Sequence, residues 1–280
     1  MKKSRGKFHV EFSLLLCTYK NDNPLHLKDC LDSILASTVH PNEIIIIKDG
    51  PLTDELDEVI ADTCFPFKKN IISLPTNQTQ GIARREGVTA ARHEWIALMD
   101  SDDIAMPDRF DKQLEVITKD PSIDILGGQI AEFDKDSACV HAIRQVPLSH
   151  ADIKTRLKTR NPFNAMTVMF KKTAAIKAGN FRYFPGFEDY DLWARMINQG
   201  AKCQNCKDIL VYARTGSGMY GRRRGLNYIR QEWRMQRQLR QLRITSKWQF
   251  VSNILQRIPV RLLPGTFIKK LYIYFTRSKS

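Results

Sequence analysis

Three carboxylates occur within four positions, directly after an apolar run at residues 95–99: Asp100, Asp102 and Asp103. The apolar run predicts a buried strand, and in open α/β sheets ligands bind beyond the carboxyl ends of the strands. Carboxylates this close repel one another unless a cation or several hydrogen-bond donors compensate. Oxygen-only ligands suit Mg²⁺ or Mn²⁺, and Mg²⁺ usually combines one or two protein carboxylates with phosphate oxygens. The position of the cluster therefore favours a divalent-metal and diphosphate site over an acidic turn that only stabilises the next helix.

A second acidic cluster consists of Glu188, Asp189 and Asp191. It begins a predicted helix at 187–199, in which Glu188 and Asp191 project from one face while Asp189 turns aside. Acids at this position could simply stabilise the helix N-terminus. The functional interpretation is a general base for a hydroxyl nucleophile near a metal-bound electrophile. A metal-bound diphosphate leaving group and one free carboxylate describe a direct displacement at a sugar carbon, which needs a single base if the stereochemistry inverts.

The first half of the chain alternates between predicted strands and helices, which indicates a parallel α/β sheet. We expect strands at 10–17, from 43 to the turn at 49–51, at 70–74 and at 95–99, and helices at 24–37, 54–61 and 81–92. The unbroken isoleucine run at 44–47 indicates a strand buried on both faces. Thr18, Asp49 and Asp100 follow three of these strands, so the sequence predicts one nucleotide-sized pocket across the strand ends.

The second half of the chain is less regular. We expect helices at 107–119, 151–158 and 187–199, and strands at 123–133, 167–170 and 208–214. Pro107 is placed in the first turn of its helix, where its missing N–H would be unpaired anyway. Gly127 and Gly128 predict a bulge or a close approach within the strand at 123–133.

The net charge of +14 is confined to the C-terminal part of the chain. Residues 216–280 contain fifteen Lys or Arg and a single acid, Glu232, whereas residues 1–215 carry equal numbers of basic and acidic side chains. We therefore expect a basic N-terminal lead at 1–10, a main domain at 11–215 and a basic, amphipathic, helical tail at 216–280.

The tail suits the surface of an anionic membrane. Residues 222–243 predict an arginine-rich helix, and a further helical face combines apolar side chains next to lysines and arginines: Phe267, Ile268, Leu271, Tyr272 and Phe275. A tail that packs on the body and a tail that binds nucleic acid are the alternatives, and the second lacks a recognition motif. No run of about 20 apolar residues occurs, so we expect a cytoplasmic protein that associates peripherally with the inner face of the cell membrane.

Five short motifs occur in an order that resembles a known family. They are Cys17-Thr18-Tyr19, Lys48-Asp49-Gly50, Gly81-Ile82-Ala83-Arg84, Met99-Asp100-Ser101-Asp102-Asp103 and Glu188-Asp189-Tyr190-Asp191-Leu192-Trp193. Together they resemble the family 2 glycosyltransferases of the GT-A fold. Residues 41–53 and 161–164 are further similar to the amylovoran-type exopolysaccharide glycosyltransferases. The resemblance covers residues 11–215 and implies an α/β fold with a single mixed, mainly parallel nucleotide-binding sheet flanked by helices.

The resemblance also implies roles for the residues that would bind the donor. Thr18 and Asp49 would contact the nucleotide base, with Tyr19 in the same donor-binding motif, and Arg84 would lie near the phosphates. Asp100 and Asp102 would form an Asp-x-Asp metal site, with Asp102 on the metal and Asp100 nearer the ribose.

Further roles concern the base and the diphosphate. Asp189 would be the catalytic base, with Glu188 and Asp191 as competitors. Members of the family often close a loop carrying Arg, His and Ser over the diphosphate. Here Arg214 and Ser217 are kept, but no histidine follows His150, so a histidine ligand from this loop is excluded. Arg222 and its two neighbouring arginines could neutralise the diphosphate instead.

The resulting hypothesis is a glycosyltransferase of the hexosyltransferase class that depends on Mn²⁺ or Mg²⁺ and inverts the stereochemistry. A UDP-linked sugar is the expected donor, and a hydroxyl of a lipid-linked glycan in surface polysaccharide biosynthesis is the expected acceptor. A sugar nucleotidyltransferase is one alternative, although it usually carries a glycine-rich signature that residues 17–21 lack. A nucleic-acid-binding protein is the other, although the two acidic clusters would repel a polyanion.

Overall fold

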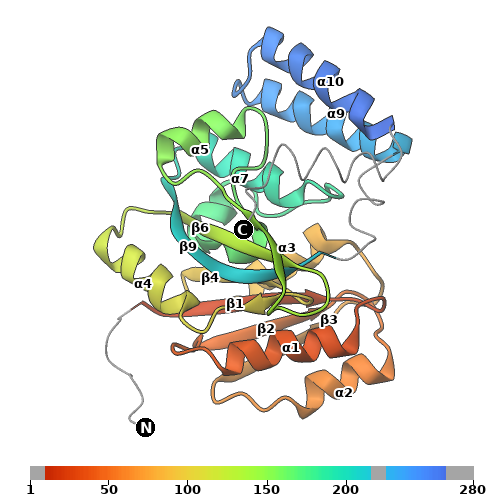
Figure 1. Ribbon diagram of the computed structural model, residues 1–280, viewed down its shortest axis with the longest axis vertical. Coiled ribbons are helices and arrows are strands. Elements are labelled where there is room, and N and C mark those ends of the chain that lie inside the picture. Colours follow the sequence, from red (N-terminus) through yellow and green to blue (C-terminus); the bar gives the residue numbers. More distant parts are fainter. Residues whose placement is uncertain (1–9, 216–224, 263–280) are drawn as a thin grey trace.

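The computed structural model describes residues 10–215 and 225–262, which build one mixed sheet with helices on both sides (Figure 1). The sheet has nine strands in the described residues, in the order β3-β2-β1-β4-β8-β6-β9-β5, and β7 pairs with β6. Their bounds are β1 Phe12–Thr18, β2 Glu43–Lys48, β3 Lys68–Ser73, β4 Trp95–Asp100, β5 Ile104–Ala105, β6 Ile125–Phe133, β7 Val140–Arg144, β8 Met169–Lys171 and β9 Cys203–Arg214. Strands β1, β2, β3, β4, β6 and β9 run in one direction and β5, β7 and β8 run in the other. The expected mixed, mainly parallel sheet is confirmed.

The N-terminal half forms the expected alternation of strands and helices. Helices α1 (Pro24–Leu35), α2 (Asp54–Asp62) and α3 (Gln80–Ala90) connect the parallel strands β1 to β4. Helix α1 begins at Pro24 because Asn23 caps it, its side chain accepting a hydrogen bond from the Leu25 amide at 2.9 Å.

The isoleucine run in β2 faces two separate hydrophobic cores. Ile44 and Ile46 pack in one core and Ile45 and Ile47 in the other, and all four are fully buried. Successive side chains of a strand point to opposite faces of a sheet, so this alternation shows that both faces of the sheet are covered. The expected burial on both faces is therefore confirmed.

The second half departs from the expected elements at several places. Helix α4 is Arg109–Lys119, so Pro107 lies before the helix and not in its first turn. The Pro107 carbonyl accepts a hydrogen bond from the Thr38 amide at 2.9 Å. The strand expected at 167–170 is found as β8, which begins two residues later, because Thr167 ends a short 3₁₀ helix, η1 (Ala165–Thr167). Helices α5 (His150–Leu157) and α7 (Glu188–Asn198) match expectation to within a residue, whereas α6 (Lys172–Lys177) was not expected.

Gly127 and Gly128 allow β6 and β9 to approach closely. A Cβ at Gly127 would lie 2.2 Å from Asn205 Oδ1, and one at Gly128 would lie 2.3 Å from Leu210 Cδ1. The register of the β6–β9 pair also shifts next to these glycines. The expected bulge or close approach is thus found, and its cause is the neighbouring strand β9.

Helices α9 (Gly225–Gln241) and α10 (Lys247–Leu262) form a hairpin that packs on the body beside α7 and α5 (Figure 1). Met235 and Leu239 of α9 are fully buried in the same core as Trp193 of α7. The helix expected at 222–243 is therefore present as α9, and it uses its apolar face to contact the body. Arg222 and the apolar face expected at 267–275 lie outside the described residues. None of the described helices is long and apolar enough to cross a bilayer.

The packing of α9 on the body predicts that Leu239→Ala lowers the free energy of unfolding by about 2–5 kcal/mol, because it leaves a cavity in the main core. Leu226→Ala is the matched control, since Leu226 lies on the same helix but is exposed, and we expect a change below about 0.5 kcal/mol. Urea unfolding followed by circular dichroism measures both. Equal values for the two variants would contradict the packing.

Candidate active site

The predicted donor-binding residues lie at one edge of the sheet, where three parallel strands end side by side. The pairing register places Cys17 next to Ile47 on one side and next to Asp100 on the other. Thr18 and Asp49 follow directly, and the Asp49 amide donates to the Thr18 carbonyl at 2.8 Å. The carboxyl ends of β1, β2 and β4 thus bring together residues that are more than 80 positions apart in the sequence.

The turn after β2 holds Asp49 in a fixed orientation. Asp49 is buried, its Oδ1 accepts a hydrogen bond from the Gln78 amide at 2.7 Å, and its carbonyl accepts one from Asn77 Nδ2 at 3.2 Å. Gly50 has φ +88°, and a Cβ there would lie 2.7 Å from the Asn77 nitrogen. Glycine is therefore required for the turn to reach the segment before α3.

Asp22 connects the loop after β1 to the loop after β4, a role that the sequence did not indicate. Its Oδ2 accepts hydrogen bonds from Thr18 Oγ1 at 2.9 Å, the Tyr19 amide at 3.2 Å and Ser101 Oγ at 2.7 Å. Burial raises the pKa of Asp22, although these three hydrogen bonds oppose the shift. Asp22 therefore fixes the positions of Thr18 and Tyr19 relative to the acidic residues after β4.

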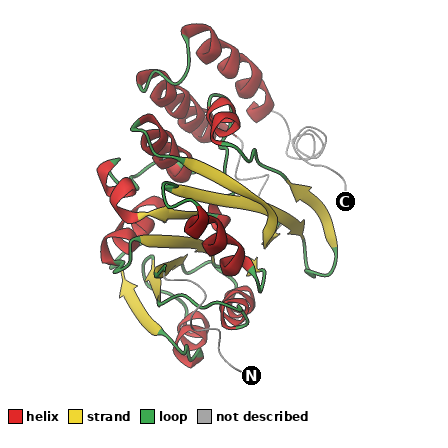
Figure 2. Cartoon of the chain, turned by 90° about the vertical axis from the view of Figure 1, so that its left-hand side faces the viewer, coloured by secondary structure: helices red, strands yellow, loops and turns green. Residues whose placement is uncertain are grey.

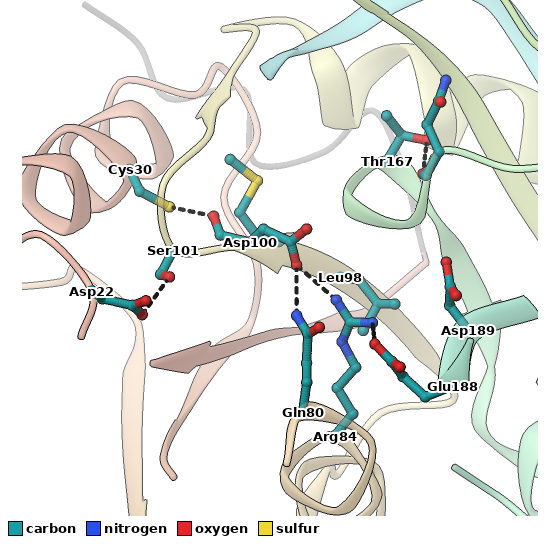
Figure 3. A network of polar contacts seen from close by, with 12 residues as sticks. Asp22, Cys30, Gln80, Arg84, Leu98, Asp100, Ser101, Thr167, Glu188 and Asp189 are labelled. Atoms are coloured by element: carbon teal, nitrogen blue, oxygen red, sulfur yellow. Dashed lines mark hydrogen bonds and ion pairs between the residues drawn. The ribbon is translucent and has the colours of Figure 1, made fainter. Parts of the chain in front are cut away.

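Arg84 lies between the two acidic clusters (Figure 3). It is buried on α3, and its Nη2 lies 2.7 Å from Asp100 Oδ1 while its Nη1 lies 3.8 Å from Glu188 Oε1. Burial alone would lower the pKa of Arg84, but the charges of Asp100 and Glu188 outweigh it and raise that pKa. Gly81 makes this approach of α3 possible, because a Cβ there would lie 2.5 Å from the Arg182 carbonyl oxygen and 3.1 Å from Glu188 Cβ.

Gln80 extends the same network. In one orientation of its amide, Nε2 donates to Asp100 Oδ1 at 3.3 Å. In the orientation rotated by 180°, the nitrogen donates to Glu188 Oε1 at 3.0 Å and the oxygen accepts from Arg84 Nη2 at 2.9 Å. The rotated orientation suits its neighbours better, since it gives both amide atoms a complementary partner. In either orientation Gln80 fills the space between the two carboxylates.

Glu188 is buried at the start of α7, facing Arg84. Burial raises its pKa to about 7, repulsion from Asp189 adds to the shift, and Arg84 opposes it. Glu188 therefore exchanges a proton near neutral pH.

Asp189 lies beside Glu188 and is only partly buried. Its Oδ2 accepts a hydrogen bond from Asn161 Nδ2 at 2.7 Å, and its Oδ1 accepts one from the Tyr190 amide at 2.7 Å. The carboxylate is thus held by one side chain from outside the helix and by the backbone of the first turn. Asn161 belongs to the segment 161–164 that the resemblance singled out, but no spacing in the sequence indicated this contact.

Asp191 has a different environment from Glu188 and Asp189. It is fully buried and pairs with Arg182 Nη2 at 2.6 Å and Arg195 Nη2 at 2.8 Å. Two arginines that both contact one buried carboxylate neutralise it and hold α7 against the segment before it. Of the three candidate bases, the structure brings Glu188 and Asp189 towards Arg84 and Asp100 and surrounds Asp191 with arginines.

The acidic residues after β4 differ in exposure. Asp100 is half-buried, Asp102 is exposed and Asp103 is buried. Asp103 Oδ1 accepts a hydrogen bond from the Arg214 amide at 2.8 Å, whereas its Oδ2 has no hydrogen-bond partner within the described part of the chain. Burial, followed by repulsion from Asp102 and Asp100, raises the pKa of Asp103 well above its usual value. The hydrogen bond from the Arg214 amide thus ties this buried carboxyl, and with it the loop, to the end of β9.

Arg214 at the end of β9 holds this acidic loop. Its Nε donates to the Asp102 carbonyl at 3.0 Å, its Nη1 to the Lys135 carbonyl at 3.2 Å, and its Nη2 pairs with Asp29 Oδ2 at 3.0 Å. The guanidinium also lies over the Phe133 ring, with its Cζ 4.7 Å from the ring centroid. These contacts direct Arg214 to protein oxygens, although the resemblance led us to expect it near the diphosphate.

A divalent cation at Asp100 and Asp102 stays a prediction, because these two carboxylates would need phosphate oxygens of a substrate as further ligands. Across residues 10–215 and 225–262, no three His, Cys, Asp or Glu side chains are grouped so as to hold a metal. Mg²⁺ is commonly held by one or two carboxylates together with phosphate oxygens, and two carboxylates at a strand end meet that requirement.

The buried environment of Glu188 predicts a pH-dependent effect on stability. Because the folded-state pKa of about 7 lies above the ordinary value of 4.5, folded protein binds the Glu188 proton more tightly than unfolded protein, and stability falls as pH rises from about 4.5 to 7. Glu188→Gln removes this loss, so the variant should match wild type at pH 5 and be more stable by about 1–3 kcal/mol at pH 8. Urea unfolding at the two pH values measures the difference, and Glu58→Gln on α2 is the control for lost charge alone. If the two proteins differ in stability by the same amount at pH 5 and at pH 8, burial does not raise the pKa of Glu188.

The ion pairs of Asp191 predict that Asp191→Asn lowers the free energy of unfolding by about 3–5 kcal/mol, because it leaves two arginines without their buried partner. Asp189→Asn is the matched control on the same helix. It keeps an oxygen for the Tyr190 amide, and we expect it to cost less than about 1 kcal/mol. Chemical denaturation distinguishes the two, and similar losses would contradict the structural role assigned to Asp191.

Comparison with known proteins places this geometry in a family. The sequence model of glycosyl transferase family 2 matches residues 13–184. The chain is 33% identical to the amylovoran biosynthesis glycosyltransferase AmsE of Erwinia amylovora, over 93% of this chain and 97% of that protein. It is 34% identical to the UDP-Gal:alpha-D-GlcNAc-diphosphoundecaprenol beta-1,3-galactosyltransferase of Escherichia coli, over 94% of this chain and 95% of that protein.

A solved structure shares the fold at low sequence identity. The crystal structure of S. aureus TarS 1–349 in complex with UDP-GlcNAc superposes with a TM-score of 0.65 at 15% identity, covering 95% of this chain and 74% of that one. The expected GT-A fold and the expected resemblance to the amylovoran-type enzymes are both confirmed. The chain belongs to glycosyl transferase family 2.

Proposed function

We propose that this glycosyltransferase moves a sugar from a UDP-linked donor to a hydroxyl of a lipid-linked glycan during surface polysaccharide synthesis, with inversion at the sugar carbon. The observation that carries the proposal is the network in which Arg84 joins Asp100, at the end of β4, to Glu188, at the start of α7. It unites the two acidic clusters at the edge of the sheet where a nucleotide would bind.

The nucleotide would lie across the carboxyl ends of β1, β2 and β4. Thr18, Tyr19 and Asp49 would contact the base, since Asp22 and the turn at Gly50 hold them at this edge. The galactosyltransferase relative acts, by its name, with UDP-Gal on a diphosphoundecaprenol-linked sugar. Its similarity over nearly the whole chain supports a UDP-linked donor and a lipid-linked acceptor here.

The diphosphate would lie at Asp100 and Asp102. These carboxylates would hold Mn²⁺ or Mg²⁺ together with phosphate oxygens, and the bound cation would stabilise negative charge on the departing diphosphate. Arg84 keeps Asp100 in place through the 2.7 Å contact, and Arg214 holds the backbone of Asp102. Arg222, outside the described residues, is the arginine that we assign to the diphosphate itself.

Asp189 is the carboxylate that we assign as the base. A general base must reach the hydroxyl whose proton it takes, and Asp189 is partly exposed whereas Glu188 is buried against Arg84. Asn161 and the Tyr190 amide orient the Asp189 carboxylate, so one oxygen can accept the acceptor proton while the hydroxyl oxygen attacks the sugar carbon. A single base corresponds to inversion.

The two alternatives receive less support. Membership of family 2 favours sugar transfer over nucleotidyl transfer, and the acidic residues at the strand ends disfavour a nucleic acid in the same site. A lipid-linked acceptor would place the enzyme at the inner face of the cell membrane, which is the location that we propose.

A panel of nucleotide sugars, with Mn²⁺ or with EDTA, tests the donor and the metal site together. We expect release of nucleoside diphosphate from one donor, lost in EDTA and reduced at least about 100-fold by Asp102→Ala, because the leaving group loses its charge stabilisation. Asp62→Ala, at the exposed end of α2, is the matched control and should leave the rate unchanged. Release that survives both EDTA and Asp102→Ala would overturn the metal site.

The base is tested by transfer to a lipid-linked acceptor. Asp189→Asn should lower kcat by about 10²–10⁴-fold while donor binding, measured by calorimetry, is retained. If Asp189→Asn keeps its activity and Glu188→Gln loses it, Glu188 is the base.

A further inference from the structure

Helix α10 carries an exposed apolar stripe that the body of the protein does not cover. Trp248 is 84% exposed, Val251 45% and Leu255 68%. Their spacing of three and four residues places them on one face of the helix. We call these three side chains the α10 stripe. Single exposed apolar residues are ordinary on protein surfaces, but an aligned set that includes a tryptophan indicates an interaction surface.

A different set of α10 side chains attaches the helix to α9. Phe250 contacts Trp233 with ring centroids 5.3 Å apart, Asn253 Nδ2 donates to Gln236 Oε1 at 2.8 Å, and Arg257 Nη1 lies 2.8 Å from Glu232 Oε1. Asn253 Nδ2 also contacts the Lys158 carbonyl at 2.8 Å, next to α5. Figures 1 and 2 show α10 as an outer layer of the molecule, separated from the sheet by α9, α7 and α5. The stripe thus lies on a helix that Phe250, Asn253 and Arg257 attach to α9.

The hairpin that carries the stripe is almost entirely positive in charge. Residues 225–262 contain eight Lys or Arg and one acid, Glu232. Glu232 is fully buried and paired with Arg257, so no acidic side chain of the hairpin faces solvent within these residues. Arg230 and Arg237 of α9 and Lys247, next to Trp248 on α10, are exposed, whereas the Arg234 guanidinium lies over the Phe184 ring of the body. A second copy of the chain would bring this positive surface against itself, which disfavours a symmetric dimer through the stripe.

We infer that the α10 stripe enters the headgroup region of an anionic phospholipid bilayer while exposed arginines and lysines of the hairpin bind lipid phosphates. An aromatic and aliphatic face bordered by cations on a helix too polar to span a membrane is the composition of an interfacial helix. The inference extends the proposed function, because it rests on a lipid-linked acceptor and names the surface that would reach it. Since Met235 and Leu239 of α9 pack in the core with Trp193 of α7, contact through α10 would also set the distance of Glu188 and Asp189 from the bilayer.

Tryptophan fluorescence of the full chain reports insertion directly. Trp95 and Trp193 are buried, so a Trp233→Phe background leaves Trp248 as the exposed tryptophan of the described residues. With phosphatidylglycerol vesicles that contain brominated lipid, we expect quenching of this emission, and Trp248→Phe in the same background should remove the quenched component. Phosphatidylcholine vesicles should give little quenching, because the arginines then lack an anionic surface.

Co-sedimentation with phosphatidylglycerol vesicles tests the stripe against a matched control. Trp248→Ser with Leu255→Ser should lower the bound fraction by about tenfold or more, whereas Leu25→Ser with Ile176→Ser, which changes exposed apolar residues on α1 and α6, should bind as wild type. Donor hydrolysis without vesicles should be equal in all of them, so a failure of the proposed glycosyl transfer is distinguished from a failure of membrane contact. Equal vesicle binding by the stripe variant, or Trp248 emission that brominated lipid does not quench, would overturn the inference. A stripe variant that binds vesicles normally but dissociates a wild-type oligomer would assign the stripe to a second copy instead.

Discussion

The ion pairs of Arg84 hold the candidate site together. A buried arginine without a charged partner is strongly unfavourable, and Asp100 supplies that partner at 2.7 Å, while Glu188 lies further away, at 3.8 Å. Asp100 is carried by the sheet and Glu188 by a helix almost 90 residues later, so Arg84 adds an electrostatic link between two elements that also share a hydrophobic core. This contact needs a glycine at position 81, because a larger residue would push α3 away from α7.

Helix α7 serves the site and the fold with different acids. Glu188 and Asp189 face the network at its N-terminus, whereas Asp191, two positions after Asp189, is enclosed by Arg182 and Arg195. The same helix contributes Trp193 to the core against which α9 packs. Its position is therefore set from three directions, by α3, by the segment before it and by the C-terminal hairpin. Rigid support of this kind keeps a catalytic carboxylate in a defined place.

The sequence allowed the N-terminal half of the fold and the main acidic residues to be predicted, because the signals there are local. The isoleucine run, the Asn23-Pro24 cap and the acidic ends of strands each depend on neighbours within a few positions. Strands β5 and β7 were missed because they are short and exist only through their pairing with β9 and β6. Asp22 and Asn161 were missed for a related reason, since each acts through contacts that form only after the loops have folded together. The spacing of Glu188 and Asp191 suggested a shared role, and the two arginines that separate their environments could not be inferred from that spacing.

The link between Arg214 and the acidic loop has a consequence for the order of folding. Residues 12–100 contain β1 to β4 and most of the predicted donor-binding residues, and these strands are connected in sequence order by α1, α2 and α3. The loop that follows gains part of its contacts only when β9 pairs with β5 and β6, because the Arg214 amide and side chain supply donors to Asp103 and Asp102 from more than 100 residues away. Contacts between residues this far apart in the sequence form late, because closing the long loop between them costs conformational entropy before the contacts stabilise the fold. During synthesis the half with β1 to β4 can therefore take shape first, while the acidic loop must wait for its contacts with Arg214 until β9 has emerged.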